Sequence, residues 1–144
     1  MNIASILATK GGRVITIRPE QSVGEAVRVL AGHNIGALVV VDQALTPVGI
    51  LSERDIVRAA ARSEQAFGQR VSEIMTRDVI TGLPHDDLLS VANTMTDRRI
   101  RHLPVVDGGR LVGIVSIGDL VKAERDTYRG KVDTLETQIL ADPA

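Results

Sequence analysis

The sequence predicts an α/β (α+β) fold in which two pseudo-symmetric β-α-β-β-α repeats pack through their sheets, followed by a C-terminal helix. The first observation behind this prediction is an internal repeat: the segment 14–55 recurs as 79–119, with one residue deleted after Asp107. The second is that each copy alternates short β-branched runs with amphipathic stretches. Because two copies of one unit usually pack against each other, we expect the 144 residues to form one body with paired features.

Each repeat is expected to open with a strand. Residues 14–17 and 79–81 are short β-branched runs, and each is followed by a proline, Pro19 or Pro84. Proline removes a backbone donor and disfavours a continuing strand, so both strands should end there.

The helix that follows each strand is predicted from a cap and an apolar stripe. Ser22 and Glu25 match a capping box, and Asp87 is suited to cap the second copy. Behind these caps, apolar residues recur at helical spacing: Val23, Ala26, Val27 and Leu30 in the first copy, and Leu88, Val91, Ala92 and Met95 in the second.

Two further strands and a helix complete each repeat. The apolar runs lack alternation, which indicates strands buried on both faces. Pro47 and the pair Gly108-Gly109 mark the turns between them, and the last helix begins after Ser52 or Ser116. The predicted strands are 37–41 and 48–51 in the first copy, and 103–106 and 111–115 in the second.

These elements divide the chain into five segments. They are an N-terminal segment (1–12), the first repeat (13–63), a connecting segment with a short helical turn near 71–75 (64–77), the second repeat (78–127), and a C-terminal helix and tail (128–144).

The C-terminal segment carries an apolar seam formed by Tyr128, Val132, Leu135 and Ile139. This seam is suited to pack on the body of the protein or on a second subunit. The protein's own Ile3, Ile6 and Leu7 are an equally good surface for it.

Composition narrows the classes of function. With 17 basic and 18 acidic residues the net charge is −1, and Phe67 and Tyr128 are the only aromatic residues, so we do not expect nucleic-acid binding. Cysteine is absent, which excludes disulfides and thiolate chemistry and favours the cytoplasm. The chain shows no signal-peptide pattern and no apolar stretch of about 20 residues, so we expect no membrane insertion.

Catalytic and metal-binding patterns are not found. His33, His85 and His102 form no chelating pair by spacing, and no serine has an adjoining histidine base. There is also no P-loop or G-x-G-x-x-G segment. We therefore expect neither an enzyme nor a metal site.

The most specific motif is Gly-x-x-Ser-x-x-Asp, which occurs once in each repeat where a strand is expected to pass into a helix. Ser52 with Asp55, and Ser116 with Asp119, fit helix caps, and for either copy alone this interpretation is favoured. The same geometry places a carboxylate and a hydroxyl beside free helix amides, which suits a ligand with a diol and an anion. Duplication of the motif favours a functional role.

The double unit, with Gly-Ile-Leu-Ser-Glu-Arg-Asp, Gly-Ile-Val-Ser-Ile-Gly-Asp and Ile-Arg-His-Leu-Pro-Val-Val-Asp, resembles a tandem pair of cystathionine β-synthase (CBS) domains, a stand-alone Bateman module. The resemblance covers about residues 8 to 125. It implies two pseudo-symmetric clefts between the repeats that bind adenosyl ligands: AMP, ADP, ATP, NAD(H) or S-adenosylmethionine. No other cofactor is implied.

The resemblance also implies roles for residues of this chain. Asp55 and Asp119 correspond to the ribose acceptors, and the two clefts are expected to differ in phosphate binding, because Arg54 stands opposite Gly118 in the repeat. The residues expected at adenosine and ribose are Thr16, Ala37, Ser52, Asp55, Thr81, Ser116 and Asp119, and those expected at phosphate are Lys10, Arg54, Arg101 and His102.

The predicted function is that of a nucleotide-binding regulatory module. Ligand would stabilise one packing of the two halves and modulate a partner protein or the assembly of the module itself, with a homodimer as the expected state. The alternative is a ligand-independent dimeric interaction scaffold that uses the C-terminal helix.

Overall fold

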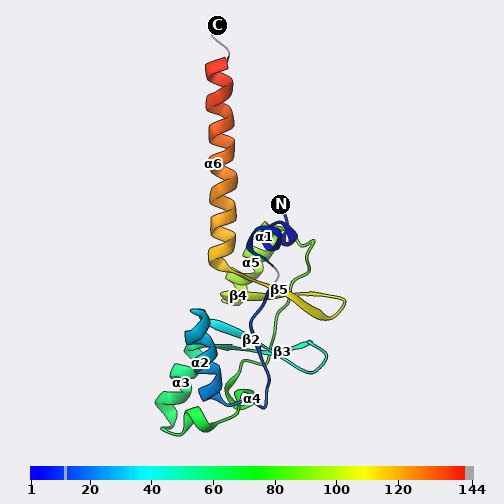
Figure 1. The fold of residues 1–144 in the computed structure, drawn as a ribbon. Helices are drawn as coiled ribbons and strands as arrows, with labels where there is room; N and C mark the ends of the chain where they lie inside the picture. The colour runs from blue at the N-terminus through cyan, green and yellow to red at the C-terminus, as the bar shows by residue number, and fades with distance from the viewer. Residues whose placement is uncertain (12, 142–144) are drawn as a thin grey trace.

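The computed structural model describes residues 1–11 and 13–141, and the side chains among them up to residue 129. Two small sheets with their helices form the body, and the last helix extends away from it (Figure 1). The predicted mixed fold with a C-terminal helix is confirmed. In chain order the elements are α1 (Ile3–Lys10), β1 (Thr16–Ile17), α2 (Val23–His33), β2 (Ala37–Val41), β3 (Pro47–Ser52), α3 (Glu53–Arg62), η1 (Ala66–Gly68), α4 (Val71–Ile74), α5 (Leu88–Arg98), β4 (His102–Asp107), β5 (Arg110–Ser116) and α6 (Ile117–Ala141).

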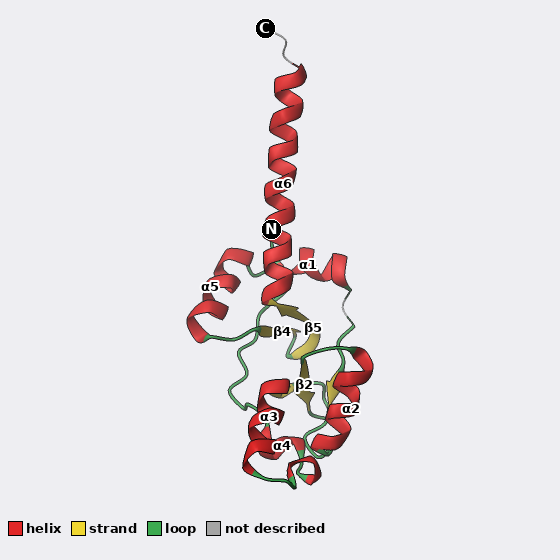
Figure 2. Cartoon of the chain, turned by 90° about the vertical axis from the view of Figure 1, so that its left-hand side faces the viewer, coloured by secondary structure: helices red, strands yellow, loops and turns green. Residues whose placement is uncertain are grey.

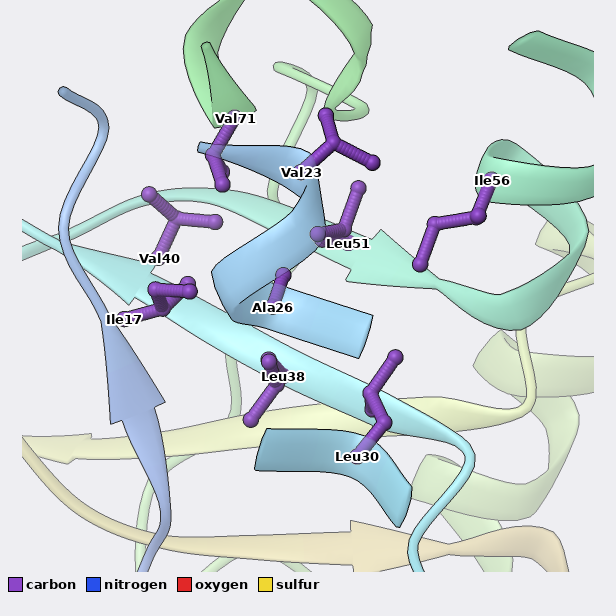
Figure 3. Close-up of a cluster of buried hydrophobic side chains, with 9 residues drawn as sticks. All are labelled: Ile17, Val23, Ala26, Leu30, Leu38, Val40, Leu51, Ile56 and Val71. Atoms are coloured by element: carbon purple, nitrogen blue, oxygen red, sulfur yellow. The ribbon is translucent and has the colours of Figure 1, made fainter. Parts of the chain in front are cut away.

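The first sheet has the order β1-β2-β3, with β1 parallel and β3 antiparallel to β2. All of β2 is buried, as the run of apolar residues predicts. Leu38 and Val40 face the first repeat's own core beside α2 (Figure 3). Ala37, Val39 and Val41 alternate with these residues along β2, so they are buried on the opposite face. The two sheets lie next to each other in the body (Figures 1 and 2). The repeats therefore pack through their sheets.

The second sheet contains β4 and β5 alone, so the predicted strand at 79–81 is wrong. A single parallel bridge from Gly82 to Val105 remains, with the Gly82 amide 2.9 Å from the Pro104 carbonyl oxygen. One step upstream, the backbone N–H of residue 104 would have to bond the carbonyl of Ile80. Pro104 has no N–H, so the ladder cannot continue there.

The turn between β4 and β5 needs glycine. Gly108 and Gly109 have φ values of 59° and 79°, and Asp107 pairs with Arg110 across them. Positive φ at both central residues matches the right-handed twist of a tight hairpin.

The predicted caps of α2 and α5 are present. Ser22 accepts a hydrogen bond from the amide of Glu25, and Asp87 accepts from the amides of the first turn of α5. The reciprocal bond of the predicted capping box is not formed among the described residues. The Glu25 carboxylate instead accepts from the side chain of Gln21 at 2.8 Å.

The segments that precede the repeats exchange partners. Helix α1, ahead of the first repeat, packs on the second one: Ile3 and Ile6 are buried in the cluster that contains Val105 and Val115. Helix α4, ahead of the second repeat, packs on the first, where Val71 is fully buried. Each half of the body is thus completed by a segment that belongs to the other half in sequence.

The backbone contacts of these two segments are equivalent. Ala4 donates to the carbonyl of Pro84 at 2.7 Å, and Ser72 donates to the carbonyl of Pro19 at 2.9 Å. Ala4 lies 15 residues before Pro19, whereas Ser72 lies only 12 before Pro84. The first segment therefore has three extra residues, and α1 runs on to Lys10.

Gly113 of β5 lies against Leu7 of α1. A Cβ atom there would lie 2.6 Å and 2.9 Å from the two Cδ atoms of Leu7. We expect Gly113→Ala to destabilise the protein by about 1 kcal/mol in urea unfolding, because the half-buried side chain of Leu7 must move away from the new methyl group. Gly118→Ala, whose nearest neighbour would be 3.6 Å away, is the matched control. Equal stability of the two variants would contradict this packing.

The base of α6 packs on the protein's own N-terminal segment. Leu120 is buried and, together with Ala123, contacts the cluster that contains Ile3 and Ile6. This contact lies upstream of the predicted seam, so it does not test how the residues from Tyr128 to Ile139 pack.

Helix α6 is longer than predicted, because the last helix of the second repeat continues into the C-terminal helix without a break. Of the predicted seam, Tyr128 is 69% exposed. Val132, Leu135 and Ile139 lie outside the residues whose side chains are described.

Candidate functional site

The first Ser-x-x-Asp motif is a helix cap. Ser52 accepts a hydrogen bond from the amide of Asp55 at 3.2 Å, and Asp55 Oδ2 accepts from the Ser52 amide at 2.9 Å and from its hydroxyl at 3.1 Å. The capping interpretation is therefore confirmed for this copy. A carboxylate has about four lone-pair sites, so the cap still leaves acceptor capacity on Asp55.

The second motif repeats this cap between Ser116 and Asp119, with bonds of 2.9 Å and 3.1 Å. Burial alone would raise the pKa of Asp119. The hydrogen bond from the Lys10 ammonium and the bonds from Ser116 outweigh burial, so the pKa lies below its ordinary value. Asp119 is thus ionised at neutral pH.

Thr76 completes the surroundings of Asp55. Its backbone N–H donates to the carbonyl of Ile50 at 2.9 Å, and its hydroxyl donates to Asp55 Oδ1 at 3.4 Å. The residue after α4 that contacts the first motif is therefore uncharged.

Lys10 takes the corresponding place at the second motif. Its Nζ atom lies 2.9 Å from the carbonyl oxygen of Ile114 and 2.7 Å from Asp119 Oδ2. Because α1 continues for an extra turn, a side-chain ammonium makes the two bonds that Thr76 makes in the first repeat with its amide and hydroxyl. The motif carboxylates therefore differ in their neighbours, one neutral and one cationic.

Both motif aspartates line cavities, of about 330 Å³ at Asp55 and about 490 Å³ at Asp119. Arg58 lines the first cavity and Lys122 the second, each three residues after the aspartate. Each cavity lies between the helix that follows the motif and the exchanged segment. Volumes of this size are typical of sites for small organic molecules.

The sheets bring further predicted residues to the motifs. Ala37 pairs with Ser52 across β2 and β3, and His102 pairs with Ser116 across β4 and β5. Thr16 pairs with Val39, two residues along β2 from Ala37, so it lies on the same face of the sheet.

Of the predicted site residues, only Asp55, Asp119 and Lys10 line the described cavities. The linings contain none of the others: Thr16, Ala37, Ser52, Arg54, Thr81, Arg101, His102 and Ser116. Thr81, Arg54 and Arg101 are also exposed. The Arg101 carbonyl accepts the amide of Ile117 at 3.0 Å, so its backbone helps to hold the start of α6.

His102 lies where the two repeats meet. Burial lowers its pKa, and the nearby cations of Lys10 and Arg101 lower it further, whereas the carboxylates of Asp119 and Glu53 oppose the shift. Glu53 belongs to the first repeat, so its influence shows that the second motif is close to both halves. His102 is therefore neutral at pH 7.

This neutral state predicts a pH dependence of stability. In the unfolded chain a histidine titrates near pH 6.5, and in the folded protein His102 binds its proton only at lower pH. Between these values the unfolded state holds more protons, so the free energy of unfolding falls as pH falls below 6.5. His102→Gln should flatten this fall in urea unfolding between pH 7 and 5. A slope equal to that of the wild-type protein would contradict the assignment.

Sequence reasoning missed the neighbours of the motifs. Thr76 and Glu53 are found only once the chain is folded. Arg58 and Lys122 could have been found from the sequence, since in both repeats a basic residue follows the motif aspartate by three positions.

Two general features of the described part of the chain bear on the site. Among the side chains that the structure describes, in residues 1–11 and 13–129, histidines and carboxylates are not grouped in a way that would hold a metal ion. No helix within these residues has the length and apolar character required to cross a membrane.

Comparison with known proteins identifies the repeats. The family model described as CBS domain matches residues 4–62 and 71–126. The CBS domain-containing protein YhcV of Bacillus subtilis is 36% identical over 118 residues, which cover 82% of this chain and 84% of YhcV. The crystal structure of the CBS-domain containing protein ATU1752 from Agrobacterium tumefaciens has a TM-score of 0.82 and 41% identity, covering 86% of this chain and 99% of that chain.

A third similar structure contains ligands. The CBS domain pair of protein MJ0100 was solved in complex with 5′-methylthioadenosine and S-adenosyl-L-methionine. It has a TM-score of 0.78 and 33% identity, and the match covers 88% of this chain and 98% of that chain. With a matched domain in each repeat, the chain belongs to the CBS-domain family.

Proposed function

We propose that this protein is a regulatory module that binds adenosyl ligands through the motif aspartates of its two repeats. The observation that carries the proposal is that Asp55 and Asp119 occupy equivalent positions in the first turn of α3 and α6, and that each of them lines a cavity. The similarity to MJ0100, which binds two adenosyl compounds, supports the ligand class.

The chemistry of the motif suits a ribose. Each aspartate is held by its serine, so its orientation is fixed before a ligand arrives, and its remaining lone pairs are available to ribose hydroxyls. Ser52 and Ser116, with Thr16, Ala37 and Thr81 toward adenine, are the proposed adenosine contacts. Arg54, Arg101, His102 and Lys10 are the proposed phosphate contacts.

The proposed output is a population shift. A ligand that binds one packing of the two repeats more tightly than another shifts the equilibrium toward it by its difference in affinity between the two packings. The carrier of the signal would be a partner protein or a second copy of the chain. Exposed apolar side chains on the projecting helix, Val121 at 58% and Tyr128 at 69%, support a homodimer through α6.

A thermal-shift panel tests the ligand class. AMP, ADP, ATP, NAD, NADH and S-adenosylmethionine are each added to the wild-type protein. A ligand at about a hundred times its Kd stabilises by about 2.7 kcal/mol, which raises Tm by several degrees. No shift with any compound would refute adenosyl binding. If, in addition, removal of residues 128–144 abolished a dimer measured by light scattering, the scaffold alternative would be supported.

A further inference from the structure

Lys10 is the feature that most clearly separates the two motifs. It is carried on the three-residue extension of the N-terminal segment, and its ammonium contacts Asp119 at 2.7 Å. Among the described residues, Asp55 has no ion pair, and its neighbour is the neutral Thr76. The repeats are therefore alike in backbone but unlike in charge at the carboxylate that is proposed to bind ribose.

The ion pair leaves groups available for a ligand. Asp119 Oδ2 accepts the bonds from Ser116 and Lys10, and Oδ1 accepts none from the described residues. The ammonium has three donors and uses two, on Asp119 and on the carbonyl of Ile114. A hydroxyl on Oδ1 would thus lie next to a free ammonium donor.

The cavity extends this pattern. Lys10 and Lys122 both line it together with Asp119, while the apolar side chains of Ile6 and Ala123 form part of its wall. The cavity therefore offers an apolar surface, an acceptor for a diol and two cationic donors, and a second carboxylate, Asp126, also lines it. Donors of this kind form strong hydrogen bonds with phosphate oxygens.

We propose that Lys10 makes the second site selective for adenosyl ligands that carry a phosphate over uncharged adenosine, and that binding at the first site does not depend on Lys10. This inference rests on the proposed function. Each cavity has two cations on its lining, Arg58 and Arg62 at the first and Lys10 and Lys122 at the second. The inference assigns the inequality of the two sites to Lys10, because among the described residues it is the cation that pairs with a motif carboxylate.

The test uses AMP and adenosine as probes and isothermal titration calorimetry as readout. Asp55→Asn isolates the second site, and Asp119→Asn isolates the first. In the Asp55→Asn protein, Lys10→Met should weaken AMP binding about tenfold or more and leave adenosine within about twofold. Lys10→Arg, which keeps the charge, should restore most of the preference for AMP. In the Asp119→Asn protein, Lys10→Met should change neither ligand.

The outcomes separate this inference from the proposed function. If AMP and adenosine bind and Lys10→Met weakens both by the same factor, or weakens neither, the selectivity is overturned while adenosyl binding stands. If neither probe nor any other adenosyl compound binds the wild-type protein, both proposals are overturned. Circular dichroism and Tm of each variant confirm that the fold is retained.

Discussion

Replacing Ile3 with alanine is expected to destabilise the protein by about 2–5 kcal/mol, as much as a change in the centre of a core. The third residue of a chain usually tolerates substitution, because termini are loosely held. Here Ile3 is 0% exposed and packs in the core of the second repeat with Val105 and Val115. Truncation of the Ile3 side chain therefore leaves a cavity in the core of the second repeat, although Ile3 precedes the first repeat in the sequence.

Urea unfolding followed by circular dichroism measures this effect. Ile3→Val should cost only about 0.5–1.5 kcal/mol, because most of the packing is kept. Leu89→Ala, on α5 but 70% exposed, should be nearly neutral. A loss for Ile3→Ala no larger than that for Leu89→Ala would show that α1 is not part of the second core.

Loss of both motif aspartates should have the largest effect on binding. We expect Asp55→Asn and Asp119→Asn each to weaken ligand binding at its own site about ten- to a hundredfold, since each removes charge-assisted bonds to a ribose. The double variant should show no thermal shift with the ligand that stabilises the wild-type protein most. Removing each cap should cost only about 1 kcal/mol of stability.

The size of these two effects separates binding from capping. If the aspartates were caps alone, the variants would lose stability and keep the full ligand-induced shift in Tm. Ser22→Ala supplies the matched control, because it removes a helix cap outside both motifs. Its ligand-induced shift should equal that of the wild-type protein.

Much of the fold could be predicted from local pattern. The apolar run at 37–41 coincides with β2, and the turn residues Gly108-Gly109 occupy the hairpin as expected. The prediction of a strand at 79–81 was wrong because it considered only the β propensity of these residues and not the strand beside them, β4. Pro104, in the neighbouring strand, lacks the donor that a ladder there requires.

The packing of α1 on the second repeat and of α4 on the first could not be predicted, because it depends on tertiary contacts between distant parts of the chain. The spacing of Ile3, Ile6 and Leu7 shows that α1 has an apolar face, but it does not say which repeat the face meets. Only packing reveals that α1 covers the second core and α4 the first.

The candidate site shows the same division. Both Ser-x-x-Asp motifs could be found from the sequence, because the residues of each motif lie within four positions of one another. The ion pair between Lys10 and Asp119 joins residues 109 positions apart. It forms because the exchanged α1 is one turn longer than α4, and no local pattern records that relation.

The motif aspartates are proposed to hold the ribose of an adenosyl ligand. The most direct measurement is a crystal structure of the protein grown with the compound that gives the largest thermal shift. We expect ribose hydroxyls within hydrogen-bond distance of Asp55 and Asp119, with each serine cap intact. A ligand bound elsewhere, with both carboxylates free of it, would show that the aspartates do not bind ribose.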